Sequence, residues 1–286
     1  MNEVYAVIVT YNPEINVLNS QYESLHNQVN GIIYVDNGSK SELIRSYKEY
    51  HNVFYIFNNS NRGLGYAQNQ GIKKSLELGA DFVLLLDQDS ELAPSMVQNL
   101  KDTYFCLISN KIKVGAVAPE VVNAFDESSH VVGVLIDGIY VKPIAIRNVP
   151  IEVSYCIASG TLIYKSVFED VGLINEYMFI DSLDLEWCMR ANYKGYKIFL
   201  SPKARLLHRL GNGEKDRISS HSPMREYYIC RNGFLLLRLS HIPLGFRIRR
   251  CVLTPLRVLT SLMTGRIGYF KNGMRGIYDA LVKGFN

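Results

Sequence analysis

Two carboxylates, Asp87 and Asp89, directly follow the apolar run Leu84–Leu86. Such a run predicts a buried strand, and a core seldom accepts unpaired carboxylates, so the two acids mark the point where the strand reaches the surface. If the strand stays extended, both side chains point to the same face and repel each other. A hard divalent cation with a phosphate ligand would remove that conflict. A surface turn, in which Asp89 caps a helix near Ala93, explains the same residues equally well.

A second polar segment, NRGLGYAQNQG at residues 61–71, contains closely spaced glycines. Gly63 and Gly65 resemble the start of a dinucleotide-binding fingerprint, but the third glycine of that pattern would fall at Gln68. The segment also follows the third predicted strand, so a nicotinamide site is not expected. The glycines would let the backbone approach a ligand, with Asn69 projecting from the second turn of the following helix. Glycines that serve only helix packing are the alternative.

The segments around these residues alternate between apolar strands and helices. Strands are predicted at residues 4–10, 31–37, 53–59 and 81–87, and helices at 12–25 and 64–79. This alternation indicates an α/β fold, with a mostly parallel sheet covered by helices on both faces. Ligands bind such sheets outside the carboxyl ends of the strands. Polar residues stand at all four of these ends: Thr10-Tyr11-Asn12, Asp36-Asn37, residues 58–62 and Asp87-Gln88-Asp89.

The charge is distributed unevenly along the 286 residues. From residue 225 onward eleven Lys and Arg residues face two acids, a balance of +9, which leaves −5 for the rest of a chain whose net charge is +4. The tail mixes these charges with aliphatic residues, and Pro243 and Pro255 are expected to divide it into short helices. Apolar faces flanked by basic residues are typical of helices at an anionic membrane surface. The aliphatic content disfavours nucleic acid as the partner, whereas packing on the catalytic domain or in a homodimer stays open.

The composition excludes several other classes of protein. Hydrophobic residues make up 48% and charged residues 20%, as in a folded globular protein. No uncharged stretch approaches the roughly 20 residues that a membrane-spanning helix needs. The N-terminus does not resemble a signal peptide, and the five cysteines show no C-x-x-C spacing. We therefore expect a cytoplasmic protein with reduced thiols.

Six motifs, in order along the chain, resemble a known family. They are VIVTYNP, YVDNGS, NRGLGYAQNQGI, LLLDQDS, FIDSLDLEWCMR and LLHRLG. The first four are similar to the nucleotide-sugar half of family 2 glycosyltransferases with the GT-A fold, a Rossmann-like, mostly parallel sheet. LDQDS with the last two is similar to the bacterial rhamnosyltransferase subgroup. The resemblance covers roughly residues 4–210.

The resemblance implies a nucleotide-sugar site at the strand ends. Asp36 would hydrogen-bond the base, Asn69 would lie along the nucleoside, and Asp87 would lie near the ribose or the metal. Asp89 would bind the cation that holds the diphosphate, and His208 would be a further ligand, which favours Mn²⁺ somewhat over Mg²⁺. The remaining residues assigned to the donor are Thr10, Tyr11, Asn12, Asn37, Arg62, Gly63 and Gln88.

The resemblance also places a catalytic base on the segment FIDSLDLE. Many members have Glu-Asp where this chain has Leu183-Asp184, so Asp184 is the expected base and Asp181 the second choice. A carboxylate can take the proton of an attacking sugar hydroxyl, and a single displacement predicts inversion at the anomeric carbon. An acid favoured by the helix dipole in a first turn is the alternative reading. Gly160 and Trp187 are the candidate acceptor-binding residues.

These observations together predict an inverting, metal-dependent enzyme. It would transfer a sugar to a lipid-linked saccharide at the inner face of the bacterial plasma membrane. The resemblance alone implies that this sugar is L-rhamnose and that its donor is dTDP-rhamnose. The catalytic domain would span residues 1–215, with the nucleotide-sugar half at about 1–110 and the acceptor half at about 111–215. Residues 216–286 would form a basic, amphipathic, helical tail. A sugar-nucleotide nucleotidyltransferase and a non-catalytic, membrane-associated carbohydrate-binding protein are the alternatives.

Overall fold

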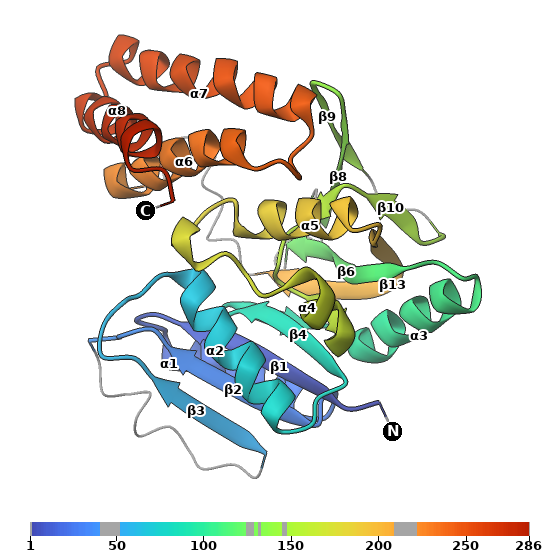
Figure 1. Ribbon diagram of the computed structural model, residues 1–286. Coiled ribbons are helices and arrows are strands. Elements are labelled where there is room, and N and C mark those ends of the chain that lie inside the picture. Colours follow the sequence, from blue (N-terminus) through green and yellow to red (C-terminus); the bar gives the residue numbers. More distant parts are fainter. Residues whose placement is uncertain are drawn as a thin grey trace.

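The computed structural model describes residues 2–40, 52–123, 129–130, 133–144, 148–208 and 222–285. A ten-stranded sheet forms the centre of the molecule, with the strand order β10-β13-β6-β12-β4-β1-β2-β3; β5 and β7 pair with β13 and β6 (Figure 1). Its strands are β1 (Val4–Thr10), β2 (Gly31–Asp36), β3 (Val53–Phe57), β4 (Phe82–Asp87), β5 (Ser90–Leu92), β6 (Val114–Asn123), β7 (Ser129–His130), β10 (Ile151–Val153), β12 (Thr161–Tyr164) and β13 (Lys197–His208).

The first four strands are parallel, as expected from their continuous apolar runs. Every residue of β2 is buried, and so are the first five of β4, which is why neither strand shows an alternating pattern. The register pairs Thr10 of β1 with Asp36 of β2, and Val9 with Asp87 of β4. The carboxyl ends of these strands therefore meet at one edge of the sheet, and the prediction of a mostly parallel α/β fold is confirmed.

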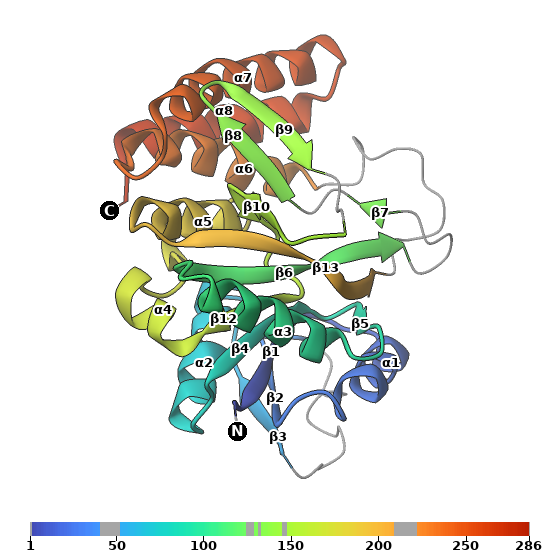
Figure 2. The ribbon, with the colours of Figure 1, turned by 90° about the vertical axis from the view of Figure 1, so that its right-hand side faces the viewer.

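Helices cover both faces of this sheet (Figures 1 and 2). On one face lie α1 (Ile15–Leu25) and α3 (Met96–Ser109), and on the other lie α2 (Leu64–Glu77), α4 (Lys165–Val171) and α5 (Leu183–Tyr193). Helix α2 can sit close to β1 because Gly71 faces the side chain of Val7, where a Cβ atom would clash. This close approach points the first turn of α2 toward the carboxyl edge of the sheet.

The second half of the sheet is mixed. Strand β12 runs antiparallel between β4 and β6, and β13 runs parallel to β6. A separate three-stranded sheet is formed by β8 (Gly133–Asp137), β9 (Tyr140–Ile144) and β11 (Tyr155–Cys156). The short 3-10 helix η2 (Glu176–Met178) precedes α5. The loops around β11, β12 and α5 return to the edge where the parallel strands end.

Three helices complete the chain: α6 (Pro223–Leu235), α7 (Leu244–Met263) and α8 (Ile267–Val282), with the 3-10 helix η3 (Leu236–Arg238) after α6. They pack together above α5 (Figure 1). The expectation that Pro255 divides the tail was wrong, since α7 continues through it for 20 residues. None of the described helices combines the length and the apolarity needed to cross a membrane. The predicted boundary at residue 216 falls outside the described residues.

Candidate functional site

A cavity of about 350 Å³ opens beside the carboxyl end of β4. Six parts of the chain contribute to it: β4, the first turns of α2, the loop before β12, the loop that leads into α5, the first turn of α5, and α6. The lining residues are Leu64, Gln68, Asp87, Ile157, Ala158, Ser159, Ile180, Asp181, Ser182, Leu183, Asp184 and Arg225. Three predicted site residues, Asp87, Asp181 and Asp184, therefore share one cavity although Asp87 lies far from the other two in the sequence.

The two acids that follow β4 do not share a strand face. Strand β4 ends at Asp87, as predicted, and Gln88 and Asp89 form a turn, so of the two readings left open by the sequence the turn is the one observed. Asp87 lines the cavity, where its backbone N–H donates to Ser159 Oγ at 3.1 Å. Gln88 turns toward β1 and accepts a hydrogen bond from the Tyr11 N–H at 2.8 Å. Asp89 is not among the lining residues.

The residues expected to bind a metal come from different elements: Asp87 ends β4, Asp89 lies in the turn that follows, and His208 ends β13. Strand β13 pairs with β5 so that His208 stands opposite Ser90, the residue after Asp89. As ligand types, carboxylates and an imidazole suit a divalent cation such as Mn²⁺ or Mg²⁺. Among the described side chains, which do not include that of His208, no three His, Cys, Asp or Glu residues are grouped closely enough to hold a metal.

Asp36 and Asn37 are buried at the end of β2, where their side chains bind other parts of the protein. Asp36 accepts hydrogen bonds from Thr10 Oγ1 at 3.3 Å and from the Ser39 N–H at 3.1 Å. Asn37 donates to Gly63 O at 3.1 Å and accepts from the Arg62 N–H at 3.1 Å. Asn37 is therefore turned away from solvent, and its side chain holds the loop before α2.

Other expected donor contacts remain at the surface. Tyr11 and Asn12 are exposed beside this edge of the sheet. The guanidinium of Arg62 lies 3.7 Å from the ring centroid of Tyr66 and is also exposed. Gly63 has φ +92°, and a Cβ atom there would lie 2.8 Å from the Phe179 ring, so glycine is required where the loop meets α2. These four residues stay candidates for the donor.

Asn69 binds other parts of the protein. Its side chain is 2% exposed, donates to Ile174 O at 2.9 Å and to Glu176 Oε1 at 2.8 Å, and accepts from the Ile174 N–H at 2.9 Å. All of its hydrogen-bonding groups are thus used to join α2 to the loop before α5. The contact of Asn69 with the nucleoside stays a prediction.

The two candidate acceptor-binding residues are buried. Trp187 is 2% exposed, and its Nε1–H donates to Gly172 O at 2.9 Å. The space beside it, about 20 Å³, holds little more than one water molecule, so Trp187 is a core residue in this structure and its contact with an acceptor sugar stays a prediction. Gly160 is buried with φ +82°, and its Cβ would lie 2.5 Å from Pro119. Its neighbour Ser159, rather than Gly160, lines the cavity.

Asp184 and Asp181 occupy contrasting surroundings. Asp181 is held by Arg225, whose Nε and Nη2 lie 3.1 and 2.9 Å from its two carboxylate oxygens. Asp184 begins α5 and accepts the Leu185 N–H at 2.9 Å. Burial raises the pKa of Asp184, the charge of Asp181 raises it further, and backbone N–H groups oppose the shift. Asp184 is therefore the stronger candidate for a base, because Asp181 is already engaged by a cation.

Arg225 was missed as a site residue because it lies in the tail. The pKa of the Arg225 guanidinium is raised mainly by its hydrogen bonds to Asp181. Burial lowers this pKa, and the negative charge of Asp87 raises it further. Arg225 thus faces Asp181 and Asp87, two of the three acids that line the cavity. The basic composition of the tail was visible in the sequence, but nothing local distinguished Arg225 from the other arginines.

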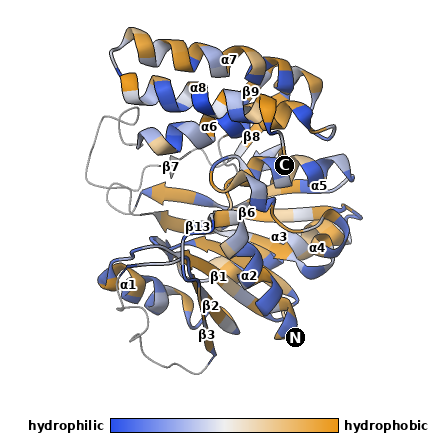
Figure 3. Ribbon diagram, turned by 60° about the vertical axis from the view of Figure 1, so that its left-hand side comes forward, coloured by the Kyte–Doolittle hydropathy of each residue, from blue (hydrophilic) through white to orange (hydrophobic). Residues whose placement is uncertain are grey.

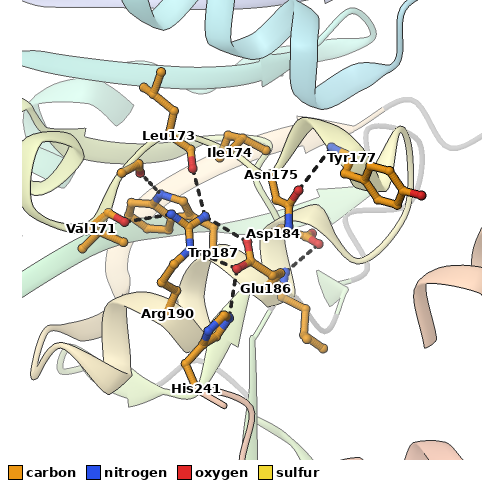
Figure 4. A network of polar contacts seen from close by, with 12 residues as sticks. Val171, Leu173, Ile174, Asn175, Tyr177, Asp184, Glu186, Trp187, Arg190 and His241 are labelled. Atoms are coloured by element: carbon orange, nitrogen blue, oxygen red, sulfur yellow. Dashed lines mark hydrogen bonds and ion pairs between the residues drawn. The ribbon is translucent and has the colours of Figure 1, made fainter. Parts of the chain in front are cut away.

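A buried network anchors α5, which carries Asp184 (Figure 4). Glu186 is 2% exposed and binds Arg190 through two oxygens at 2.9 Å, and Nε2 of His241 lies 2.9 Å from Oε1. Burial raises the pKa of Glu186, but the hydrogen bonds from His241 and Arg190 outweigh it and lower the pKa. Arg190 also donates to Val171 O and Leu173 O at 2.7 and 2.9 Å. Since His241 precedes α7, the network joins the C-terminal helices to α5.

Comparisons with known proteins agree with this architecture. The family model described as glycosyl transferase family 2 matches residues 5–172. The dTDP-rhamnosyl transferase RfbF of Shigella flexneri is 34% identical over 96% of this chain and 97% of its own. Among solved structures, S. aureus TarS superposes with a TM-score of 0.60 at 15% identity, covering 99% of this chain and 82% of that one. The mannosyltransferase PcManGT of Pyrobaculum calidifontis gives 0.57 at 12% identity, with 99% and 76% covered.

These matches establish both the fold and the family. The two structural neighbours share the fold at low identity, whereas the family model and the RfbF relative span most of this sequence. The predicted resemblance is confirmed: the chain belongs to glycosyl transferase family 2 and is a rhamnosyltransferase-like glycosyltransferase.

Proposed function

We propose that the protein is an inverting transferase that moves L-rhamnose from dTDP-rhamnose to a saccharide acceptor. The observation that carries the proposal is the shared cavity: Asp87, at the donor edge of the sheet, and Asp184, at the start of α5, line the same space together with Arg225. The name of the 34% identical relative supports dTDP-rhamnose as the donor.

In the proposed reaction Asp184 acts as the general base. Its partly buried carboxylate accepts the proton of the acceptor hydroxyl while the hydroxyl oxygen attacks the anomeric carbon. The bond from that carbon to the phosphate oxygen breaks, and dTDP leaves with the electron pair. One displacement inverts the configuration. The raised pKa of Asp184 suits this role because a more basic carboxylate takes the proton more readily.

Positive charge is needed where the diphosphate leaves. Arg225 lies in the cavity and can supply part of it. Asp87, Asp89 and His208 are the residues proposed to hold a divalent cation, which when bound would neutralise charge on the departing diphosphate. The PcManGT structure, which contains GDP-Man and Mn²⁺, supports the choice of cation by analogy of fold.

The C-terminal helices suggest where the acceptor is presented. Apolar residues recur along α7 and α8 (Figure 3). Those exposed to solvent on the two helices are Leu244, Ile248, Val252, Leu253, Leu256, Leu259, Leu262, Met263, Ile267, Met274, Tyr278, Leu281 and Val282. Lys271 and Arg275 are exposed among them. We infer that this surface, the α7–α8 face, rests on the anionic inner surface of the plasma membrane and that the acceptor is lipid-linked.

The domain division follows from the same reasoning. We propose that residues 1–110 bind the donor and residues 111–215 contribute to the acceptor side, while α7 and α8 form the membrane-facing part. Helix α6, placed in the tail by the sequence, works with the catalytic part because Arg225 lines the cavity.

The test is an assay of the purified full chain with dTDP-rhamnose, Mn²⁺ or Mg²⁺, and lipid-linked acceptors. Release of dTDP that requires an acceptor supports the proposal. Formation of dTDP-rhamnose and pyrophosphate from dTTP and rhamnose 1-phosphate would identify a nucleotidyltransferase instead. Binding of donor and vesicles without turnover would identify a non-catalytic protein.

A further inference from the structure

The loop that leads into α5 has an unusual backbone. Phe179, Asp181 and Ser182 have φ values of +60°, +65° and +66°, in the left-handed region that residues with a Cβ atom rarely occupy. Such conformations persist only where surrounding contacts impose them. Asp181 lines the cavity, and Asp184 follows two residues after Ser182. The loop therefore needs an external support, and the position of the proposed base depends on it.

The support comes from one side chain of α6. Asn232 is fully buried, and its Nδ2 lies 2.8 Å from Met178 O, 2.7 Å from Ile180 O and 2.8 Å from Asp181 O. An amide nitrogen carries two hydrogens, so three carbonyl groups share them. Its Oδ1 accepts from Arg231 Nε at 3.1 Å, which fixes the orientation of the amide. One buried amide thus binds the backbone along most of the left-handed stretch.

Neighbouring contacts hold the same loop from two sides. On the side of α6, Arg231 Nη2 donates to Tyr177 O at 2.7 Å, and the rings of Phe179 and Tyr228 stack with centroids 4.7 Å apart. On the side of α2, the Leu64 N–H donates to Phe179 O at 2.6 Å. The loop therefore lies between the helix that starts at the donor edge and the first helix of the tail.

Helix α6 is itself fixed to α7. Glu226, 1% exposed, accepts hydrogen bonds from Arg257 Nε at 2.6 Å and Nη2 at 2.7 Å. Helix α8 also packs closely, since Gly276 faces the backbone of Tyr227. A rigid helix can impose a strained loop conformation, whereas a loosely attached one would relax with it.

We propose that Asn232 is a positioning residue for sugar transfer: its buried amide fixes the loop 178–182 and so holds Asp184 against the cavity. The proposal rests on the proposed function for its catalytic part. The proposal explains why Asn232, a residue of the C-terminal helices, donates its hydrogen bonds to the backbone of the cavity loop rather than to its own helix.

The experiment compares Asn232→Ala with Asn232→Ser, which keeps one donor, and with the control Asn272→Ala. Asn272 lies on α8 and donates to Gly268 O of its own helix at 2.9 Å, an exposed contact that holds no loop of the cavity. Hydrogen–deuterium exchange of the full chain should speed up in residues 178–185 for Asn232→Ala, less for Asn232→Ser, and not for the control. Unchanged exchange in this segment for both Asn232 variants would overturn the proposal.

Kinetics separate a positioning role from a loss of folded protein. For Asn232→Ala we expect kcat, per folded molecule, to fall about 100-fold, with KM for dTDP-rhamnose near the wild-type value. If part of the protein is merely unfolded, the total activity falls in proportion to the unfolded fraction. KM and the exchange pattern of the folded molecules then stay unchanged. If Asn232→Ala folds and turns over at the wild-type rate, the proposal is wrong.

The pH profile adds an independent readout. Among the described residues, Asp181 on the loop, Tyr155 on β11 and Cys188 on α5 interact electrostatically with Asp184, and Asp87 and Arg225 line the same cavity. A looser loop admits water, which lowers the raised pKa of Asp184, so the acidic limb of kcat should move to lower pH in Asn232→Ala. A limb that stays in place would contradict the proposal. Wild-type protein without any turnover would instead overturn the proposed function, and the exchange data would still decide whether Asn232 fixes the loop.

Discussion

The cavity is built from two regions that position their acids in different ways. At the edge of the parallel strands, Asp87 is placed by backbone pairing, because β4 is buried and in register with β1. In the loop before α5, Asp181 and Asp184 are placed by side chains from α6 and by the buried network around Glu186. The first region is rigid by secondary structure alone. The second depends on contacts made by residues much later in the chain, so it is the more sensitive to substitution.

The largest effect is expected for Asp184→Asn, which tests whether the second region performs the chemistry. Loss of a general base typically reduces turnover 10²- to 10⁴-fold, and we expect the upper end because Asp181 is engaged by Arg225. Donor affinity should stay near normal, as measured by calorimetry with dTDP-rhamnose. The control Asp102→Asn removes an exposed acid on α3. Turnover of Asp184→Asn at the wild-type rate would remove Asp184 from its role.

A smaller effect, on stability, is expected for Glu226→Gln, which weakens the attachment of α6 to α7. Glu226 is 1% exposed and Arg257 is about half exposed, so we expect a loss of about 2 kcal/mol, below the range for fully buried pairs. Denaturant unfolding measures it. Glu152→Gln, in an exposed pair with Lys197, should change the free energy of unfolding by less than about 1 kcal/mol. Equal effects of the two substitutions would argue against a special support for α6.

The membrane-facing part of the same helices is tested by Leu256→Glu. Leu256 is 50% exposed on the α7–α8 face, and losing its insertion would cost about 1.5 kcal/mol, or roughly a tenfold weaker partition into anionic vesicles. Val149→Glu replaces an apolar residue of similar exposure elsewhere. If Leu256→Glu changes the molar mass by light scattering but not vesicle binding, the face joins two copies instead. Deletion from residue 222 is less informative because it also removes Arg225 and Asn232.

The smallest effect concerns the pH dependence of turnover. Asp184 must be deprotonated to act as a base, and its pKa is raised by burial and then by the charge of Asp181. Activity should therefore fall as the pH drops through this raised pKa, above the range of an ordinary carboxyl group. Asp181→Asn removes the nearby negative charge, so the pKa of Asp184 should fall and the acidic limb of the pH profile should move to lower pH. Burial still keeps the pKa of Asp184 above the ordinary value. A limb that moves to higher pH would contradict this account of the electrostatics.

Sequence patterns predicted the parallel half of the molecule well. The strands 4–10 and 81–87 and the helix that follows Gly63 were predicted within a few residues, because hydrophobic periodicity is local. The same patterns placed Asp87 at the correct edge. At Asp89 the structure chose between two readings that the sequence left open, an extended strand and a turn, in favour of the turn. For Asn69 the helical position was predicted, but its hydrogen-bond partners were not.

The sequence by itself already contained the order of the apolar strands and their polar ends. It also contained the acids that a divalent cation and a base would use. Which acid is buried, which is held by Arg225, and which amide supports the loop were decided only by the tertiary structure. The physical reason is that burial and side-chain hydrogen bonds join segments distant in sequence, and no local periodicity records them. The basic tail shows this most clearly: its composition pointed to a membrane surface, whereas its packing placed Arg225 and Asn232 beside the cavity.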